Sequence, residues 1–224
     1  MRTSLTPDQL ELYVTRLLEN HLPDGAAPTY ALRPLIDRTL ERVEHCFSRI
    51  HRKYYQDEGE TVFDHLNGDH AATFLYLLSN TAWHEANDDR LPTKLFYLNK
   101  IMHGLDLFYS VQMPDVFLLV HPLGAVLGKA TYSDYLVVYQ SATVGADAGT
   151  YPRFGEGVIL YSSSSVIGDC EVGSNVVFGA NSMVVNAEVP NDTVVVGQYP
   201  SHRFIPNPTP VRERIFAPMD RQAE

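Results

Sequence analysis

Apolar residues recur at every sixth position through the second half of the chain. The repeated positions are Phe154, Leu160, Val166, Val172, Phe178 and Val184. A period of six is typical of a triangular coil, in which each face is a short strand and three faces close one turn of about eighteen residues. One side chain per face then points inward and stacks on its equivalent in the next coil. This spacing predicts a left-handed parallel β-helix.

Two further properties recur in phase with this ladder. The residue four places after a ladder position must be small or modest, because the interior of a coil is crowded. These residues are Val158, Ser164, Cys170, Val176 and Ser182. Glycine directly follows the ladder residue at Gly155, Gly173 and Gly179, where the backbone turns tightly and a Cβ would be costly. The agreement of three signals makes the fold prediction specific.

The repeat also extends towards the middle of the chain, with one break. Counting back in sixes from Val144 gives the weaker ladder positions Val138, Tyr132, Val126 and Val120. From Val144 to Phe154 is ten residues rather than six, which predicts about four extra residues within 146–153. These residues would leave a corner as a loop. Because glycine, proline and aromatic residues are concentrated there, we interpret the loop as a working part of the surface.

The first hundred residues show helical spacing instead. Thr6 and Pro7 suit the N-cap and the first turn of a helix, and further helices are expected over 35–50, 71–84 and 92–107. We therefore expect a mainly β protein in which an α-helical N-terminal domain at 1–108 covers the open end of the β-helix. The β-helix domain would occupy 109–206. Five prolines between 190 and 210 then predict an extended C-terminal tail at 207–224.

Composition and charge narrow the class of partner. With 224 residues, of which 45% are hydrophobic, the chain can bury a sizeable core. The formal net charge of -10 argues against nucleic acid, because phosphate binding needs clustered lysine and arginine. Cys46 and Cys170 give no disulfide framework, which suits a cytoplasmic location. Neither a signal peptide nor a membrane-spanning segment is predicted.

Four short motifs point to a known family. They are HPLG at 121–124, YQSATVG at 139–145, GEGV at 155–158 and VGQYP at 196–200. Through them, residues 105–206 resemble the hexapeptide-repeat acyltransferases, and within these the serine acetyltransferase branch. The resemblance implies an O-acetyltransferase that takes acetyl-CoA as co-substrate and acts on the hydroxyl of a small acceptor. It also implies a homotrimer, which the helical domain could pair into a dimer of trimers.

The chemistry of acetyl transfer supports His121 as the catalytic base. A hydroxyl must lose a proton as it attacks a thioester, and histidine is suited to accept that proton near neutral pH. The solenoid holds one other histidine, His202, and the resemblance places the catalytic histidine of the family on His121. It further implies an orienting aspartate about fifteen residues upstream, which is the place of Asp106. Asp115 is a rival for that role.

Three positions depart from the serine acetyltransferase pattern. The family has an acidic residue directly before its histidine, where this chain has Val120. It has an arginine-histidine pair before the proline of its inserted loop, where this chain has Thr150 and Tyr151. In the family these groups hold serine, so we predict a less charged acceptor, such as a sugar, a nucleotide sugar or a secondary metabolite. Val120, Thr150, Tyr139 and Tyr151 would line its pocket.

Coenzyme A leaves few side-chain signals, because the family binds it largely through backbone amides along the coils of two subunits. The resemblance nevertheless gives positions for it. Gly145 and Ala146 would lie near the thioester, Ser163, Ser164 and Ala180 along the pantetheine, and Arg203 near the adenosine phosphates.

Other classes of β-helix protein fit the sequence less well. A β-helix carbonic anhydrase needs three zinc-binding histidines, more than the solenoid offers, so no metal is expected. A nucleotidyltransferase needs a glycine-rich, basic N-terminal motif that the chain lacks. Two alternatives stay open, namely a trimeric scaffold without catalysis and N-acetylation of an amino sugar at the same histidine.

Overall fold

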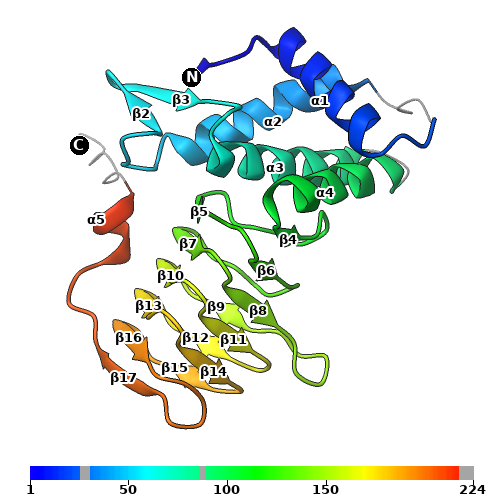
Figure 1. The fold of residues 1–224 in the computed structure, drawn as a ribbon. Helices are drawn as coiled ribbons and strands as arrows, with labels where there is room; N and C mark the ends of the chain where they lie inside the picture. Colours follow the sequence, from blue (N-terminus) through cyan, green and yellow to red (C-terminus); the bar gives the residue numbers. More distant parts are fainter. Residues whose placement is uncertain (26–30, 86–88, 217–224) are drawn as a thin grey trace.

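Helices gather at one end of a solenoid of stacked coils, and the chain then returns along the outside of the coils (Figure 1). The computed structural model describes residues 1–25, 31–85 and 89–216. The long helices are α1 (Pro7–His21), α2 (Leu32–Phe47), α3 (Gly68–Glu85) and α4 (Arg90–His103). A small sheet accompanies them, formed by β1 (Arg2–Thr3), β2 (Gln56–Asp57) and β3 (Glu60–Phe63). The predicted combination of N-terminal helices with a mainly β remainder is confirmed.

Helix α1 begins where the sequence predicts. Gln9 N donates to Thr6 Oγ1 at 3.3 Å and Thr6 N donates to Gln9 Oε1 at 2.9 Å, so the two residues form a capping box. Pro7 follows in the first turn, where its missing N–H costs nothing. Helices α2, α3 and α4 begin two or three residues earlier than the spacing predicts.

Helix α3 is the most buried helix and carries the domain junction. Every residue from Ala72 to Ala82 is buried, because the helix packs against α2, α4 and the first coil. Tyr76 Oη donates to the carbonyl of Val111 at 2.6 Å, and Asn80 Nδ2 donates to that of Tyr109 at 2.8 Å. These bonds fix α3 to the segment that enters the solenoid. Among the described residues, no helix is both long and apolar enough to cross a membrane.

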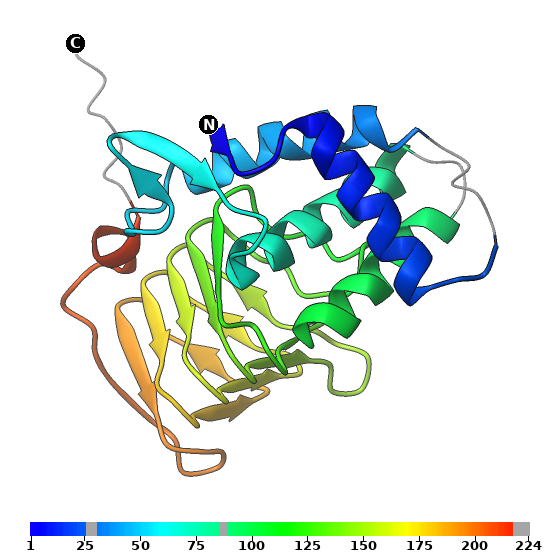
Figure 2. The ribbon, with the colours of Figure 1, turned by 45° about the horizontal axis from the view of Figure 1, so that its top comes forward.

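Three sheets of stacked short strands form the solenoid (Figures 1 and 2). The six-stranded sheet contains β5 (Phe117–Val120), β7 (Leu136–Tyr139), β10 (Val158–Leu160), β13 (Val176–Phe178), β16 (Thr193–Val196) and β17 (Arg203–Pro206). The five-stranded sheet contains β4 (Asp106–Leu107), β6 (Val126–Leu127), β8 (Thr143–Gly145), β11 (Ser165–Ile167) and β14 (Met183–Val185). The third sheet contains β9 (Arg153–Phe154), β12 (Glu171–Val172) and β15 (Glu188–Val189). All neighbours pair in parallel except β16 and β17, and the predicted β-helix is confirmed.

The register of the strands measures the length of each coil. Val166 pairs with Val184, eighteen residues later, as a regular coil requires. Val144 pairs with Val166, twenty-two residues later. The difference is the four-residue insertion predicted within 146–153. All three of these valines are fully buried, as expected for the inward ladder.

The ladder loses its predicted phase in the first coil. Leu119 and Leu127, rather than Val120 and Val126, occupy the interior, and Val126 is 43% exposed. Two changes in spacing cause this. Leu127 lies seventeen residues before its register partner Val144 rather than eighteen, which puts Val126 out of phase. The corner between the two strands then holds two extra residues, since Leu119 to Leu127 spans eight residues. The equivalent step in the next coil, from Val138 to Val144, spans six. The prediction that Val120 and Val126 point inward is therefore wrong.

The glycines that follow ladder residues are needed where coils approach closely. A Cβ built on Gly155 would lie 2.8 Å from the backbone of Gly173 and Ser174, and one on Gly173 would lie 2.6 Å from the backbone nitrogen of Asn191. Backbone atoms of a stacked coil cannot move aside as a flexible side chain can. The glycine pattern is thus a consequence of coil stacking.

The end of the chain differs from the predicted extended tail over 207–216. Strand β17 pairs antiparallel with β16, and a short helix, α5 (Val211–Ile215), packs back on the coils. Val211 and Ile215 are buried, and the Arg212 guanidinium lies 4.5 Å from the centre of the Tyr135 ring. Ile215 O then accepts a hydrogen bond from His51 N at 2.8 Å. The remainder of the predicted tail, 217–224, lies outside the described residues.

Coil stacking gives a stability test with a matched control. Gly155→Ala should lower the free energy of unfolding by about 1–3 kcal/mol, because its methyl group meets backbone. Gly68→Ala should change it by less than about 0.5 kcal/mol or stabilise the chain, because no atom lies within 4 Å of its Cβ position. Urea unfolding of both variants measures this. Equal effects would contradict the proposed cause.

Candidate functional site

The predicted base lies on the widened corner of the first coil. Five residues, 121–125, separate the paired positions Val120 and Val126, whereas three, 140–142, separate their partners Tyr139 and Thr143. The surplus residues bulge outward, and His121 takes a left-handed backbone conformation with φ of 48°. Its side chain is 79% exposed. The corner therefore presents the imidazole to solvent at the end of β5.

A carboxylate from the helical domain lies directly beside this histidine. His121 N donates to Asp69 Oδ1 at 2.8 Å, and His121 Nδ1 lies 3.7 Å from the same oxygen. Asp69 is in the first turn of α3, and its side chain is 20% exposed. Burial raises the pKa of this carboxyl, while the His121 N–H and the charge of the imidazole oppose the rise. Sequence reasoning missed Asp69, because an acid in a first helical turn usually only complements the helix dipole.

Two predicted pocket residues lie close to this pair. Val120 and Tyr139 are register partners on neighbouring strands, and the Tyr139 ring lies 4.9 Å from that of Tyr161 in the next coil. Burial raises the pKa of Tyr139, and the nearby Tyr161 and the charge of Asp69 raise it further. The charge of Arg52 opposes this rise. The site thus combines groups from the solenoid, α3 and the loop after α2.

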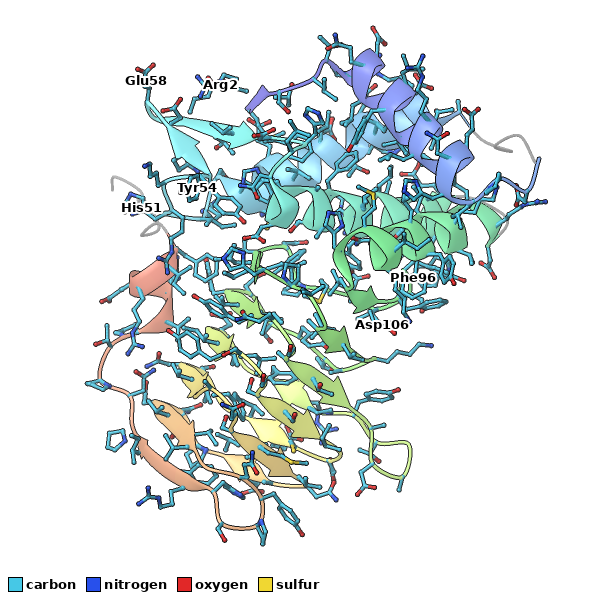
Figure 3. All side chains as sticks on the ribbon, viewed as in Figure 1. Arg2, His51, Tyr54, Glu58, Phe96 and Asp106 are labelled. Atoms are coloured by element: carbon cyan, nitrogen blue, oxygen red, sulfur yellow. The ribbon has the colours of Figure 1, made fainter. Side chains whose placement is uncertain are left out.

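Asp106 lies elsewhere in the first coil. It is on β4, where it is the register partner of Val126, and its Oδ2 is 2.6 Å from Lys100 Nζ. In Figure 3 it lies beneath α4, on the other side of the molecule from His51 and Tyr54. Within the described ranges, no hydrogen bond or ion pair joins Asp106 to His121. Asp115, the rival, is exposed ahead of β5.

The edge between the six-stranded and five-stranded sheets is called here the histidine edge. It carries His121, Ser141, Ser163 and Asn181, all with positive φ. Ser163 and Ala180, both predicted beside the pantetheine, are exposed along this edge. Arg203 is exposed at its far end, paired in register with Val196. Ser164 is fully buried inside the solenoid, so its side chain cannot contact a ligand on the surface.

The remaining predicted residues lie at the opposite edge of the five-stranded sheet, called here the loop edge. Gly145 ends β8, and the inserted loop then carries Ala146, Thr150 and Tyr151. Asp147 and Thr150 exchange backbone hydrogen bonds of 3.1 and 2.9 Å, which close the loop into a tight turn. The Tyr151 ring covers Gly128, whose Cβ would lie 2.5 Å from it. Within one protomer the loop edge is therefore separated from His121 by the width of a sheet.

Other features do not coincide with this site. A hollow of about 440 Å³ is lined by none of the predicted residues. Its lining is Trp83, Phe108, Tyr109, Ser110, Val111, Gln112, Lys129 and Ala130. In the part of the chain that the structure describes, no three His, Cys, Asp or Glu side chains are grouped as a metal site would require.

Comparison with known proteins connects the fold to a class. No family model matches the chain. The curated serine acetyltransferase of Synechococcus elongatus is 29% identical over 112 residues, which are 48% of this chain and 46% of that protein. That of Staphylococcus epidermidis is 30% identical over 110 residues, or 47% and 51%. The chain thus spans about half the length of the curated relatives it matches.

Solved structures extend the likeness to the whole fold. The serine acetyltransferase of Vibrio cholerae covers 91% of this chain and 82% of its own, with a TM-score of 0.68 and 21% identity. A serine acetyltransferase in complex with CoA covers 86% and 74%, with a TM-score of 0.55 and 18% identity. The fold is that of the hexapeptide-repeat acyltransferases. Within this class the chain is similar to the serine acetyltransferases, so the resemblance that the four motifs indicated is confirmed.

The residue after Asp69, His70, lies in the core of the helical domain and has a lowered pKa. His70 is fully buried among the rings of Phe47, Tyr55 and Phe63, and its Nδ1 accepts a hydrogen bond from Asp64 N at 3.1 Å. Burial lowers the pKa of His70 from 6.5 to about 4, so the ring is neutral at pH 7.

This burial makes stability depend on pH. The unfolded chain binds a proton at His70 before the folded chain does, so stability is complete above about pH 6.5 and falls towards pH 4. Between these values, protonation of His70 should cost the native chain up to about 3 kcal/mol of its free energy of unfolding. The His70→Gln variant should not lose this part. Denaturant titrations from pH 7 to 4 measure this, with the exposed His84→Gln as control. A native pH dependence in the His70 variant would contradict the assignment.

Proposed function

We propose that the protein is an acetyl-CoA-dependent O-acetyltransferase with His121 as its general base. The observation that carries the proposal is the exposed imidazole on the widened first-coil corner, next to the partly buried carboxylate of Asp69. The similarity to serine acetyltransferases supports the reaction class. Of the two alternatives left open, a scaffold gives no reason for a corner that exposes a histidine beside an acid.

The reaction needs one group that accepts and returns a proton. The acceptor hydroxyl gives its proton to His121 as its oxygen attacks the thioester carbonyl. The tetrahedral intermediate then collapses, the C–S bond breaks, and the imidazolium returns the proton to the leaving thiolate. The products are the acetyl ester and free coenzyme A. The exposed ring of His121 leaves room for both substrates.

The donor fits along the histidine edge. In this proposal, the pantetheine passes Ser163 and Ala180, and Arg203 meets the adenosine phosphates. Five strand spacings of about 4.8 Å separate β5, which ends beside His121, from β17, which begins at Arg203, so the two residues are roughly 24 Å apart along the stack. Gly145 and Ala146 lie at the loop edge, so they reach the thioester only from a second protomer. This separation supports a homotrimer, in which a loop edge faces the next histidine edge.

Two observations bear on the identity of the acceptor. The curated relatives are named serine acetyltransferases, which favours serine. Val120, Thr150 and Tyr151 favour an acceptor with less charge, as the motifs suggested. Asp69 weakens that second argument, because it supplies a carboxylate at His121 that the motifs do not reveal. We therefore place serine first and an uncharged hydroxyl acceptor second.

Donor binding can be tested without knowing the acceptor. Calorimetric titration with acetyl-CoA should give about one site per protomer. Arg203→Ala should weaken binding several-fold, because one charge-assisted hydrogen bond contributes about 1.5–3 kcal/mol when fully formed and less at an exposed position. The control is Arg16→Ala on the exposed face of α1, which should bind normally. Absence of binding in the native chain would favour a scaffold or another acyl donor.

Turnover separates the acceptor classes. Release of free thiol from acetyl-CoA should be measured with L-serine, an uncharged sugar and the matching amino sugar. His121→Ala should lower kcat by about 10²- to 10⁴-fold and leave donor affinity unchanged. Faster turnover with serine supports the first acceptor, and faster turnover with the sugar supports the second. Preference for the amino sugar would contradict O-acetylation.

A further inference from the structure

We propose that Asp69, which the helical domain supplies, is the positioning residue of His121, in place of Asp106. The inference rests on the proposed function, because it assigns a partner to the proposed base. In this arrangement the helical domain contributes to the reaction as well as covering the end of the solenoid. Three observations carry it: the contact, the fixed position of Asp69 and the engagement of Asp106.

One carboxylate oxygen of Asp69 lies close to both the backbone N–H and the imidazole of His121. Asp69 Oδ1 accepts the backbone N–H of His121 at 2.8 Å, which holds the bulged corner against α3. The same oxygen is 3.7 Å from Nδ1. Because the imidazole is exposed, a small rotation of the ring closes this gap to a hydrogen bond, as substrate binding commonly does at catalytic pairs. Nδ1–H then faces the carboxylate and Nε2 faces the acceptor.

Asp69 itself has little freedom. Its backbone N–H donates to Asn67 Oδ1 at 3.0 Å, and its carbonyl accepts Thr73 Oγ1 at 2.9 Å. The first turn of α3 also favours a negative charge through the helix dipole. Residues 72–82 of α3 are buried and the helix also contacts β5, so the backbone of Asp69 is fixed relative to the corner and its carboxylate stays within reach of His121. A fixed carboxylate stabilises the imidazolium that forms during proton transfer.

Asp106 is already engaged. Its Oδ2 bonds Lys100 Nζ at 2.6 Å, and its strand places it beside Val126, beyond the corner. A separation of fifteen residues brings an aspartate close to His121 only in a regular coil. Here the widened corner 121–125 separates His121 from Val126, the register partner of Asp106. Among the described residues, the titratable groups whose charges couple to Asp69 include Tyr139 and the buried Tyr55. Tyr139 is in turn coupled to Tyr161 in the next coil and to Arg52 in the loop after α2.

A pair of amide variants tests the assignment. Asp69→Asn keeps an oxygen for the His121 N–H and removes only the charge, so the corner should stay folded. Without the charge, the imidazolium is less stable and His121 loses its proton at lower pH. The acid limb of kcat/KM should move down by roughly half a pH unit, the size expected for a partly exposed charge pair, and kcat should fall about tenfold or more. Asp106→Asn should leave both unchanged.

A second measurement needs no turnover, so failure of the proposed function stays distinguishable. The ring of His121, identified by comparison with His121→Asn, can be titrated by NMR in substrate-free protein. The pH midpoint of this titration should be lower in Asp69→Asn and unchanged in Asp106→Asn. By reciprocity, the Asp69 carboxyl should titrate at higher pH in His121→Asn, a test that leaves Asp69 intact. An unchanged His121 midpoint in Asp69→Asn, or a shift only in Asp106→Asn, would overturn the inference.

Discussion

The close stacking of one coil on the next is the constraint on which the rest of the structure depends. Each inward side chain must meet its equivalent about eighteen residues away, so a regular coil has no room for an extra residue. Extra residues can only leave at corners, and they do so twice. Two of them widen the corner that carries His121, and four form the loop that carries Tyr151. The irregularities of the solenoid are therefore the places where its surface chemistry is concentrated.

The helical domain meets the solenoid at one of these irregularities. Helix α3 already contacts β5, and the widened corner follows directly after that strand. The bulge at 121–125 brings a backbone N–H to Asp69, and the contact is strengthened by burial around α3. This polar contact joins the helical part of the chain to the solenoid at the site itself, in addition to the bonds of Tyr76 and Asn80. The site consists of that junction together with the edge that leads away from it.

Much of the solenoid could be predicted because its period is a direct consequence of packing. The ladder, its small partners, the glycines and the four-residue insertion all follow from the regular stacking of one coil on the next. The junction could not, because the approach of Asp69 to His121 depends on how two domains dock. The phase error at Val120 arose from a corner expansion that leaves no compositional mark. The fold-back of 207–216 was missed because Val211 and Ile215 are too few to reveal a buried helical face.

The fold-back changes how the solenoid can come apart. A stack of coils held by nearest-neighbour contacts can fray from its free end, one repeat at a time. Here the last coil continues into β17 and α5, and Ile215 is hydrogen-bonded to His51 beside the helical domain. The far end of the stack is thus tied to its beginning by the chain itself. Loss of the last coil requires release of this tie, so the two ends of the solenoid are coupled in a single cooperative unit.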